Sequence, residues 1–424
     1  MDKTFVPTPV GGTITIPGSK SQTIRALLIA TLSGETSIIH NALDSQDTQS
    51  CMDLCTQLGA VLTWNDNHDT LNCNATKIKN LKGSHTLDCG NSGTTLYLAT
   101  GMLASLPGIF TFTGDGQLQK RPIGPLLDAL EALGATIVRK NGTFPPFSIE
   151  GPLRGGSCSI ECPTSQYLSG LLLACCLSKG DCNINVPLLY EKPYVNLTLQ
   201  WMNEQNLYYE ISADLQKAKT FGNQHFKGFE AMVTGDFSSA SFFFCMAAIG
   251  KTKISVKGLN AQDVQGDKKI LDILSQMGCT VTWEDTTVTL EGPQQLKGGT
   301  FDLNSMPDTL PILAVTACFA QEDVHLVNVP QARIKETDRI AVMHEELARL
   351  GAQIEEQEDG MTIKAGHPLH GGTVYGHDDH RVIMALSAAS IALKDRLHLI
   401  GIDAASITFP SFFNLFDSIR GDVL

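Results

Sequence analysis

The chain has few charged residues and no excess of basic ones. Asp, Glu, Lys and Arg make up 18% of its 424 residues, and the formal net charge is −13. A nucleic-acid-binding protein needs a basic surface, so this composition argues against that class. Apolar residues make up 42% of the chain, which excludes a disordered protein, and the length favours two domains.

Long apolar runs and metal-binding cysteine patterns are also missing from the sequence. The most apolar stretch, YLSGLLLACCL, is much shorter than the roughly 20 residues of a membrane-spanning helix, and the opening MDKTFVPTPVGG has no secretory signal. We therefore expect a soluble, cytoplasmic protein. The twelve cysteines form no CxxC pair and no Cys/His cluster, which favours buried free thiols over zinc ligands.

The sequence does contain a repeat of about 72 residues. In each copy a short polar stretch opens an apolar segment typical of a buried helix, and the first polar residues are 72, 73, 72, 72 and 71 positions apart. These starts are Ser19, Asn91, Thr164, Asp236, Asp308 and Asp379. Six copies predict six βαβα-type units, three in each domain, because six units are too many for one core.

A second helical segment in each of five copies ends before a residue that tolerates left-handed backbone. These residues are Gly59, Gly134, Asn206, Gly278 and Gly351. Glycine and asparagine are favoured just after the end of a helix, so each should terminate a helix there.

Cations accompany several of the polar helix starts. Lys20 and Arg25 lie in the opening motif PGSKSQTIR, and Arg381 lies in DHR. Small polar residues alone could simply cap the helices, but cations are unfavourable at a helix N-terminus unless an anion binds between them. The motif lacks the G-x4-G-K-[ST] pattern of a nucleotide-binding loop, so the sequence indicates a different anion site.

The ordered motifs PGSKSQTIRALL, GNSGTT, KRPIGPLLDAL, TSQYLSGLL, MPD, KETDR and DHR cover the whole chain. Together they resemble the 5-enolpyruvylshikimate-3-phosphate synthase family. The resemblance implies an α/β fold of two domains forming an inside-out α/β barrel, with six βαβαββ repeats, three per domain. Domain I would comprise residues 1–18 plus 234–424 and domain II residues 19–233, with chain crossings near Gly18 and Thr234.

The resemblance also implies a reaction. The family transfers the enolpyruvyl group of phosphoenolpyruvate to the 5-hydroxyl of shikimate 3-phosphate and releases phosphate, by addition and elimination through a tetrahedral intermediate. It implies no metal and no cofactor, two small-molecule substrates held in an interdomain cleft, no nucleic acid or membrane partner, and a monomer.

The motifs carry the family's site roles onto this chain. Asp308 would be the base for the 5-hydroxyl, Glu336 would exchange the proton at the methylene carbon, and Lys20 would be catalytic near both substrates. The residues implied for shikimate 3-phosphate are Lys20, Ser21, Arg25, Thr164, Ser165, Gln166, Tyr194, Asp308 and Lys335. Those implied for phosphoenolpyruvate are Lys20, Asn91, Gly93, Arg121, Gln166, Arg339 and Arg381.

Considered without the resemblance, several of these residues have ordinary interpretations. Asp308 alone would be a helix N-cap, and Lys335 with Glu336 would be an exposed charged loop. His380, beside Arg381, is interpreted as an orienting residue because the family assigns the chemistry to the arginine.

Three positions depart from the family pattern. Tyr97 replaces a usual Arg, Ile407 replaces a frequent Lys, and Glu191 replaces a frequent Ser. The first two remove cations, so we expect weak binding of phosphoenolpyruvate, and Ile407→Lys should lower its KM.

Two other functions are considered. A sister enzyme acts on UDP-N-acetylglucosamine and carries a Cys five residues before the Arg of its RP loop, where this chain has Gly116. A non-catalytic binding protein of the same fold is the other, and a phosphate-release assay with both substrates distinguishes it.

Overall fold

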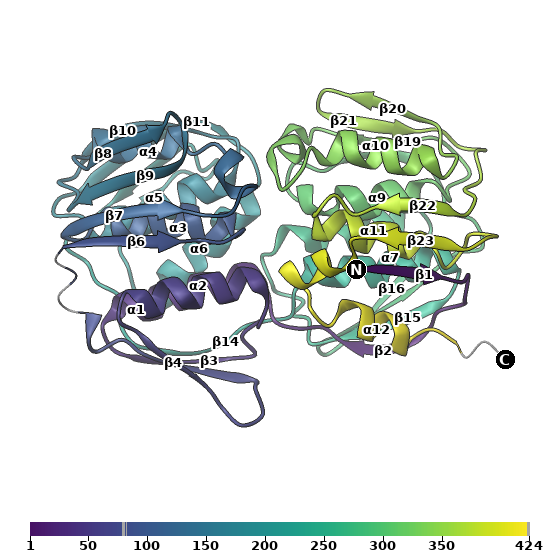
Figure 1. Cartoon of the computed structure of the whole chain (residues 1–424), viewed down its shortest axis with the longest axis horizontal. Coiled ribbons are helices and arrows are strands. Elements are labelled where there is room, and N and C mark those ends of the chain that lie inside the picture. Colours follow the sequence, from purple (N-terminus) through teal and green to yellow (C-terminus); the bar gives the residue numbers. More distant parts are fainter. Residues whose placement is uncertain (79–80, 82, 422–424) are drawn as a thin grey trace. The chain divides into compact units, whose positions relative to one another are not determined.

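The computed structural model describes residues 1–78, 81 and 83–421 and contains two compact units (Figure 1). Unit 2 is Gly18–Val233, and unit 1 contains Met1–Pro17 and the chain from Thr234 onward. The first boundary lies one residue before the 18/19 division made from the sequence. Gly18 packs into unit 2 so closely that a Cβ atom there would lie 1.9 Å from the carbonyl oxygen of Asn41.

Each unit is built on three helices whose residues are mostly buried. They are α1 (Lys20–Ser33), α3 (Gly93–Leu103) and α5 (Ser165–Leu177) in unit 2, and α7 (Phe237–Gly250), α9 (Leu310–Ala317) and α11 (His380–Ala389) in unit 1. A second helix follows each one: α2 (Gln46–Gln57), α4 (Gly124–Ala132), α6 (Lys192–Glu204), α8 (Ile270–Gln276), α10 (Arg339–Arg349) and α12 (Phe412–Ser418). This alternation follows the repeat in the sequence.

The positions of the helix ends agree with the sequence-based predictions better than the positions of the helix starts do. Gly59, Gly134, Asn206, Gly278 and Gly351 all have positive φ, between 56° and 104°, directly after a helix. The predicted left-handed helix ends are therefore confirmed. Two predicted starts are wrong: Ser92 rather than Asn91 caps α3, and Asp308 lies inside the short 3-10 turn η4 (Pro307–Thr309).

Three four-stranded sheets cover the helices of unit 2. Their strand orders are β6 (Ser84–Asp88), β7 (Gly108–Thr113), β9 (Phe144–Gly151), β8 (Thr136–Asn141); β10 (Gly156–Cys162), β11 (Cys182–Leu189), β13 (Lys217–Thr220), β12 (Tyr209–Ile211); and β14 (Glu230–Met232), β3 (Thr36–His40), β5 (Thr70–Asn74), β4 (Val61–Trp64). In each sheet the first two strands are parallel and the others antiparallel, as a βαβαββ repeat requires.

Unit 1 repeats this topology. Its sheets have the orders β2 (Gly12–Thr15), β15 (Lys253–Lys257), β17 (Thr287–Glu291), β16 (Thr280–Glu284); β18 (Gly299–Asp302), β19 (Val324–Val327), β21 (Gly360–Ile363), β20 (Ile354–Gln357); and β22 (Gly372–Tyr375), β23 (Leu397–Ile400), β1 (Asp2–Phe5). The N-terminal β1 completes the last sheet by pairing antiparallel with β23. The prediction of six repeats, three per unit, is confirmed.

Two strands are exchanged between the repeats on either side of the crossings. β2 precedes α1 in the chain but pairs with β15, while β14 precedes α7 but pairs with β3. The chain therefore passes from unit 1 to unit 2 after Pro17 and returns after Val233.

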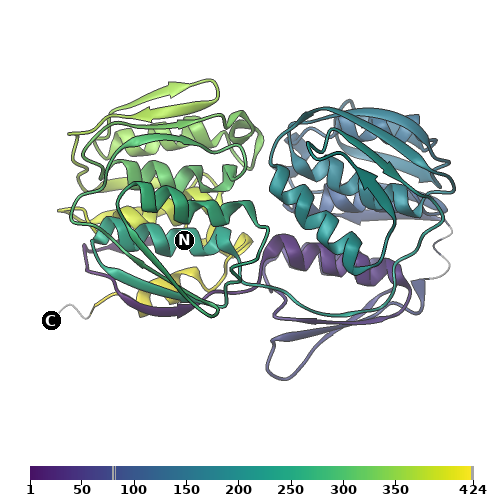
Figure 2. The ribbon, with the colours of Figure 1, turned by 180° about the vertical axis from the view of Figure 1, so that it is seen from behind.

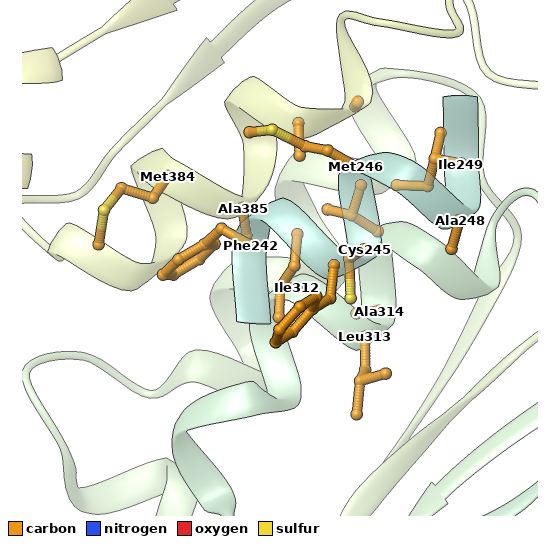
Figure 3. Packing of buried hydrophobic residues seen from close by; sticks show 14 of the residues in the cluster. Phe242, Cys245, Met246, Ala248, Ile249, Ile312, Leu313, Ala314, Met384 and Ala385 are labelled. Carbon is orange, nitrogen blue, oxygen red and sulfur yellow. The ribbon is translucent and has the colours of Figure 1, made fainter. Parts of the chain in front are cut away.

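Each unit has its own hydrophobic core. In unit 1, α7, α9 and α11 pack together, and Figure 3 shows Phe242, Ile312 and Ala385 from these helices in one apolar cluster. In unit 2, α3 packs against α1 and α5, and Figure 2 shows the purple α1 beside the teal helices α5 and α6. All twelve cysteines are free thiols and ten are buried, as predicted. Among the described residues, no helix has the length and apolar character needed to span a membrane.

Candidate active site

The candidate residues of unit 1 gather around the guanidinium of Arg339, the first residue of α10. Its side chain is fully buried and donates to Asp379 through Nε (2.9 Å), to Asp308 through Nη1 (2.8 Å) and to Glu336 through Nη2 (2.6 Å). Burial disfavours its charge, but Asp379, Glu336 and Asp308 outweigh this effect and raise the pKa of Arg339. The arginine is a fixed positive centre among three carboxylates.

Asp308 connects this centre to a second arginine. Its Oδ1 accepts from Arg339, and its Oδ2 lies 2.9 Å from Nη2 of Arg381, at the start of α11. The helix-capping interpretation of Asp308 is therefore wrong, because Thr309 occupies the N-cap position of α9 and both carboxylate oxygens contact arginines. The side chain keeps 20% of its surface exposed, so the carboxylate is not sealed inside the unit.

Asp379 and Glu336 hold the rest of this cluster in place. Asp379 caps α11 by accepting from the backbone N–H groups of Arg381 and Val382, and it also accepts from Thr337. Glu336 is only 9% exposed, so the interpretation as an exposed charged loop is wrong for this residue. Lys335, the residue before it, is half-buried.

His380 lies beside the cluster as a buried neutral imidazole. Burial lowers its pKa to about 3, and neither ring nitrogen has a hydrogen-bond partner within the described part of the chain. At neutral pH this residue therefore contributes no positive charge, and Arg381 and Arg339 supply the local cations.

In unit 2 the start of α3 and the loop before α4 position Arg121. Its Nη2 donates to Oδ1 of Asn91 at 3.0 Å, and the Asn91 amide donates to Asp115 and Gln117. The backbone of Gly93 lies so near that an added Cβ would stand 2.7 Å from Nη1 of Arg121. Three predicted phosphoenolpyruvate residues, Asn91, Gly93 and Arg121, are thus neighbours.

Tyr97 supports the same loop. Its hydroxyl donates to the carbonyl oxygen of Pro122 at 3.2 Å, the ring packs edge-on against Tyr167, and the Tyr167 hydroxyl donates to the same carbonyl. Tyr97 therefore contributes a polar contact to the residue after Arg121, although it carries no charge.

Gln166 and Lys20 occupy two further helix starts. The Gln166 amide donates to the Thr94 hydroxyl at 3.0 Å, which links the first turns of α5 and α3. Nζ of Lys20 lies 3.1 Å from Oδ2 of the buried Asp47 in α2. An ion pair of this kind fixes the ammonium at the N-terminus of α1, where the helix dipole alone would disfavour it.

Arg25 crosses the interior of unit 2. It is fully buried and donates to Thr198 (2.9 Å), to the backbone oxygen of Ser21 (2.9 Å), to Ser169 (3.4 Å) and to the backbone oxygen of Tyr194 (3.2 Å). Burial lowers the pKa of Arg25 to about 10, so it stays charged at neutral pH. These contacts connect α1, α5 and α6, so Arg25 also has a structural role that the sequence did not indicate.

Thr164 and Ser165 surround a carboxylate of the protein itself. Oε2 of Glu191 accepts from the Ser165 hydroxyl (2.8 Å), the Ser165 backbone N–H (3.1 Å) and the Thr164 hydroxyl (3.2 Å). Thr164 also caps α5. The two residues that the sequence assigns to the substrate phosphate therefore bind a carboxylate of the protein in this structure.

Comparison with known proteins identifies the family. The model of the family described as EPSP synthase (3-phosphoshikimate 1-carboxyvinyltransferase) matches residues 6–416 of this chain. The chain belongs to the EPSP synthase family. It is 40% identical to the 3-phosphoshikimate 1-carboxyvinyltransferase of Ruminiclostridium cellulolyticum over 98% of this chain and 97% of that protein. It is 39% identical to the enzyme of the same name from Acetivibrio thermocellus over 97% of this chain and 96% of that protein.

Solved structures show the same fold at lower sequence identity. EPSP synthase from Acinetobacter baumannii matches with a TM-score of 0.83 and 24% identity, over 99% of this chain and 98% of that one. The enolpyruvyl transferase NikO from Streptomyces tendae matches with a TM-score of 0.79 and 16% identity, over 98% and 96%. The predicted enolpyruvyl transferase fold is confirmed.

Ile407, one of the departures from the EPSP synthase pattern, is a core residue in the structure. Ile407 ends the 3-10 helix η6 (Ile402–Ile407) and is 9% exposed within the core of unit 1. A lysine there would have to extend its ammonium out of an apolar site, so Ile407→Lys should also lower stability.

Sequence reasoning missed the residues that hold the others. Asp47 lies outside the motifs listed for the resemblance and pairs with Lys20, while Asp115 and Gln117 lie before KRPIGPLLDAL and accept from Asn91. Tyr167 lies within TSQYLSGLL but received no role, although it supports the loop after Arg121. Asp379 carried a visible signal as the sixth helix start but received no role. The described residues also include a potential metal-ligand group of Glu345, Glu346 and His377. Its central Glu346 already accepts from His377 and from the Tyr375 backbone N–H, and it forms an ion pair with Arg349.

Proposed function

We propose that the protein transfers the enolpyruvyl group of phosphoenolpyruvate to the 5-hydroxyl of shikimate 3-phosphate. Membership of the EPSP synthase family over residues 6–416 supports the reaction class. The observation that carries the chemistry is the position of the Asp308 carboxylate between Arg339 and Arg381. Glu336 pairs with Arg339 as well. A base, a second proton-exchanging carboxyl group and two cations are the groups that this reaction needs.

Asp308 takes the proton of the 5-hydroxyl as its oxygen bonds to C2 of phosphoenolpyruvate. Glu336 delivers a proton to the methylene carbon, and this addition gives the tetrahedral intermediate. The C2–O bond to phosphate then breaks, the phosphate leaves with the proton that Asp308 took from the 5-hydroxyl, and the carboxylate of Glu336 removes a proton from the new methyl group to restore the double bond. One residue can do both because it gives a proton in the first half and regains one in the second.

Cations hold the anionic groups of phosphoenolpyruvate during these steps. We assign this role to Arg121, Arg339, Arg381 and Lys20, with Asn91, Gly93 and Gln166 as neutral neighbours. The planar guanidinium matches carboxylate and phosphate oxygens with two parallel hydrogen bonds. Because Asp308 and Glu336 occupy Arg339, the incoming anion has to share that guanidinium with them.

Shikimate 3-phosphate is assigned to the start of α5 and the residues around it. Thr164 and Ser165 supply donors for its phosphate, and Lys20, Lys335 and Arg25 supply positive charge. Ser21, Gln166 and Tyr194 complete the residues proposed for this substrate. We expect the enzyme to be a cytoplasmic monomer that works without a metal or cofactor. Cell fractionation, light scattering and turnover in excess chelator test these three points.

The test is a phosphate-release assay with phosphoenolpyruvate and a choice of acceptor. Release is expected with shikimate 3-phosphate and not with UDP-N-acetylglucosamine, because Gly116 replaces the Cys of the enzyme that uses the sugar nucleotide. Release with neither acceptor would favour a non-catalytic binding protein, and release with only the sugar nucleotide would contradict the assignment.

A further inference from the structure

The side chain of Glu191 binds another helix instead of its own. Glu191 directly precedes α6 in left-handed backbone, with φ 57°, and makes no capping bond to that helix. Its carboxylate instead reaches the N-terminus of α5, where Oε2 accepts from Thr164 and twice from Ser165. Only 3% of the residue surface is exposed.

Three donors around one oxygen at the N-terminus of a thirteen-residue helix form a strong anion site. The hydroxyls of Thr164 and Ser165 and the Ser165 backbone N–H are the donors that the proposed function gives to the phosphate of shikimate 3-phosphate. In this structure an oxygen of Glu191 takes all three. The protein thus carries its own anion at the position assigned to the substrate phosphate.

We infer that Glu191 competes with the phosphate group of shikimate 3-phosphate for the N-terminus of α5 and so sets the affinity for this acceptor. This inference rests on the proposed function. Two anions on the same donors repel each other, and a donor hydrogen cannot serve both fully. Substrate therefore binds when the Glu191 side chain turns away, and the cost of releasing its hydrogen bonds raises the KM for the phosphorylated acceptor.

The test replaces Glu191 by serine, which removes the competing charge and leaves a short hydroxyl. The KM for shikimate 3-phosphate should fall on the order of tenfold, because charge-assisted hydrogen bonds no longer have to be broken before the substrate binds. Unphosphorylated shikimate does not need these donors, so it serves as the internal reference. Its inhibition constant, measured in competition with shikimate 3-phosphate, gives its affinity for the wild-type enzyme. Its dissociation constant, measured by calorimetry, should stay within twofold in the variant.

Two further variants separate competition from other effects. Glu161→Ser removes a carboxylate from an exposed position on β10, three residues before Thr164, without touching the α5 start, and should leave both constants unchanged. Glu191→Gln keeps the size of the side chain and one acceptor oxygen. It should give an intermediate KM for shikimate 3-phosphate, and it decides the question if the serine variant fails to fold.

Failure of the inference and failure of the proposed function give different results. No turnover by the wild-type protein with shikimate 3-phosphate would reject the proposed function, and calorimetric binding of that compound would still test the competition. An unchanged or higher dissociation constant for shikimate 3-phosphate in both folded Glu191 variants would overturn the inference. Equal tightening of shikimate and shikimate 3-phosphate would also overturn it, because such an effect is independent of the phosphate.

Discussion

At the scale of single residues, two arginines fix the orientation of the Asp308 carboxylate. Each oxygen of its carboxylate contacts a different arginine, Arg339 at 2.8 Å and Arg381 at 2.9 Å. Such contacts would fix the orientation of the proposed base before substrate arrives, and preorganisation of this kind is a main source of enzymatic rate enhancement. The two arginines come from separate repeats, so the arrangement depends on the folded unit.

Asp308→Asn should lower kcat by about 10²- to 10⁴-fold, because an amide keeps the shape but cannot accept the hydroxyl proton. Steady-state kinetics with both substrates measures the effect. Asp285→Asn, the same change at an exposed turn of unit 1, should leave kcat unchanged. A kcat within threefold of the wild type in Asp308→Asn would remove Asp308 from the role of base.

Gly93→Ala should raise the KM for phosphoenolpyruvate on the order of tenfold, because displacing Arg121 weakens a charge-assisted contact. The added Cβ would stand 2.7 Å from Nη1 of Arg121, so the guanidinium has to move. The KM for shikimate 3-phosphate should change little. Gly116→Ala, in the loop before Arg121 with no atom within 4 Å of the added Cβ, is the control. Equal phosphoenolpyruvate KM values in the two variants would contradict the proposed contact.

His380 should make the protein sensitive to acid. Its ordinary pKa of 6.5 is lowered to about 3 in the folded protein by burial. The unfolded chain therefore binds the proton first, and stability falls as pH drops from about 6.5 toward 3 with a slope of up to about 1.4 kcal/mol per pH unit. His380→Gln removes this contribution. Urea unfolding at pH 7.5, 6.0 and 5.0 should give a shallower pH dependence for the variant, and identical slopes would refute the effect.

At the scale of helices, α3 and α5 cross with their backbones in contact. A Cβ at Gly101 would lie 2.4 Å from the carbonyl oxygen of Gly170, and one at Gly170 would lie 2.6 Å from the carbonyl oxygen of Tyr97. This close crossing aligns the starts of the two helices, where Gln166 bonds to Thr94. The spacing of two helices thus sets the spacing of candidate binding residues.

Gly170→Ala should destabilise the protein by about 1–3 kcal/mol, because the methyl group forces apart helices that have no free space. Denaturant unfolding measures the loss, with Gly116→Ala as the control for the change of residue type. A difference below about 0.5 kcal/mol between the two variants would show that the crossing adapts at little cost.

The sequence predicts the helices better than their contacts. The repeat and its terminal glycines depend on local backbone preferences, so they could be read directly, and even Asn206 has the expected left-handed φ of 56°. The start of α9 could not be predicted in this way, because the short helix η4 precedes it. The contacts of Asp308 could not be predicted either, because its partners lie 31 and 73 positions away along the chain. Likewise, a sequence shows Glu191 as a substitution but not that its carboxylate reaches Thr164.

At the scale of the whole molecule, two units with separate cores share one continuous chain. Strands β2 and β14 each complete a sheet whose other strands lie more than 150 residues away along the chain. Candidate residues are divided between the units, with Asp308, Glu336 and the arginines of α10 and α11 in unit 1 and Lys20, Arg121 and Ser165 in unit 2. We therefore expect activity to require both units.

The reaction itself, run in heavy water with shikimate 3-phosphate and phosphoenolpyruvate, tests the account most directly. Addition places one solvent-derived proton on the methylene carbon of phosphoenolpyruvate and so makes a methyl group. Elimination then removes one of the three methyl hydrogens, so part of the product keeps the solvent-derived one. Mass spectrometry and NMR should therefore show one enolpyruvyl ether product per phosphate released, with deuterium in its vinyl methylene group. Absence of the ether product, or phosphate release without it, would contradict the proposed function.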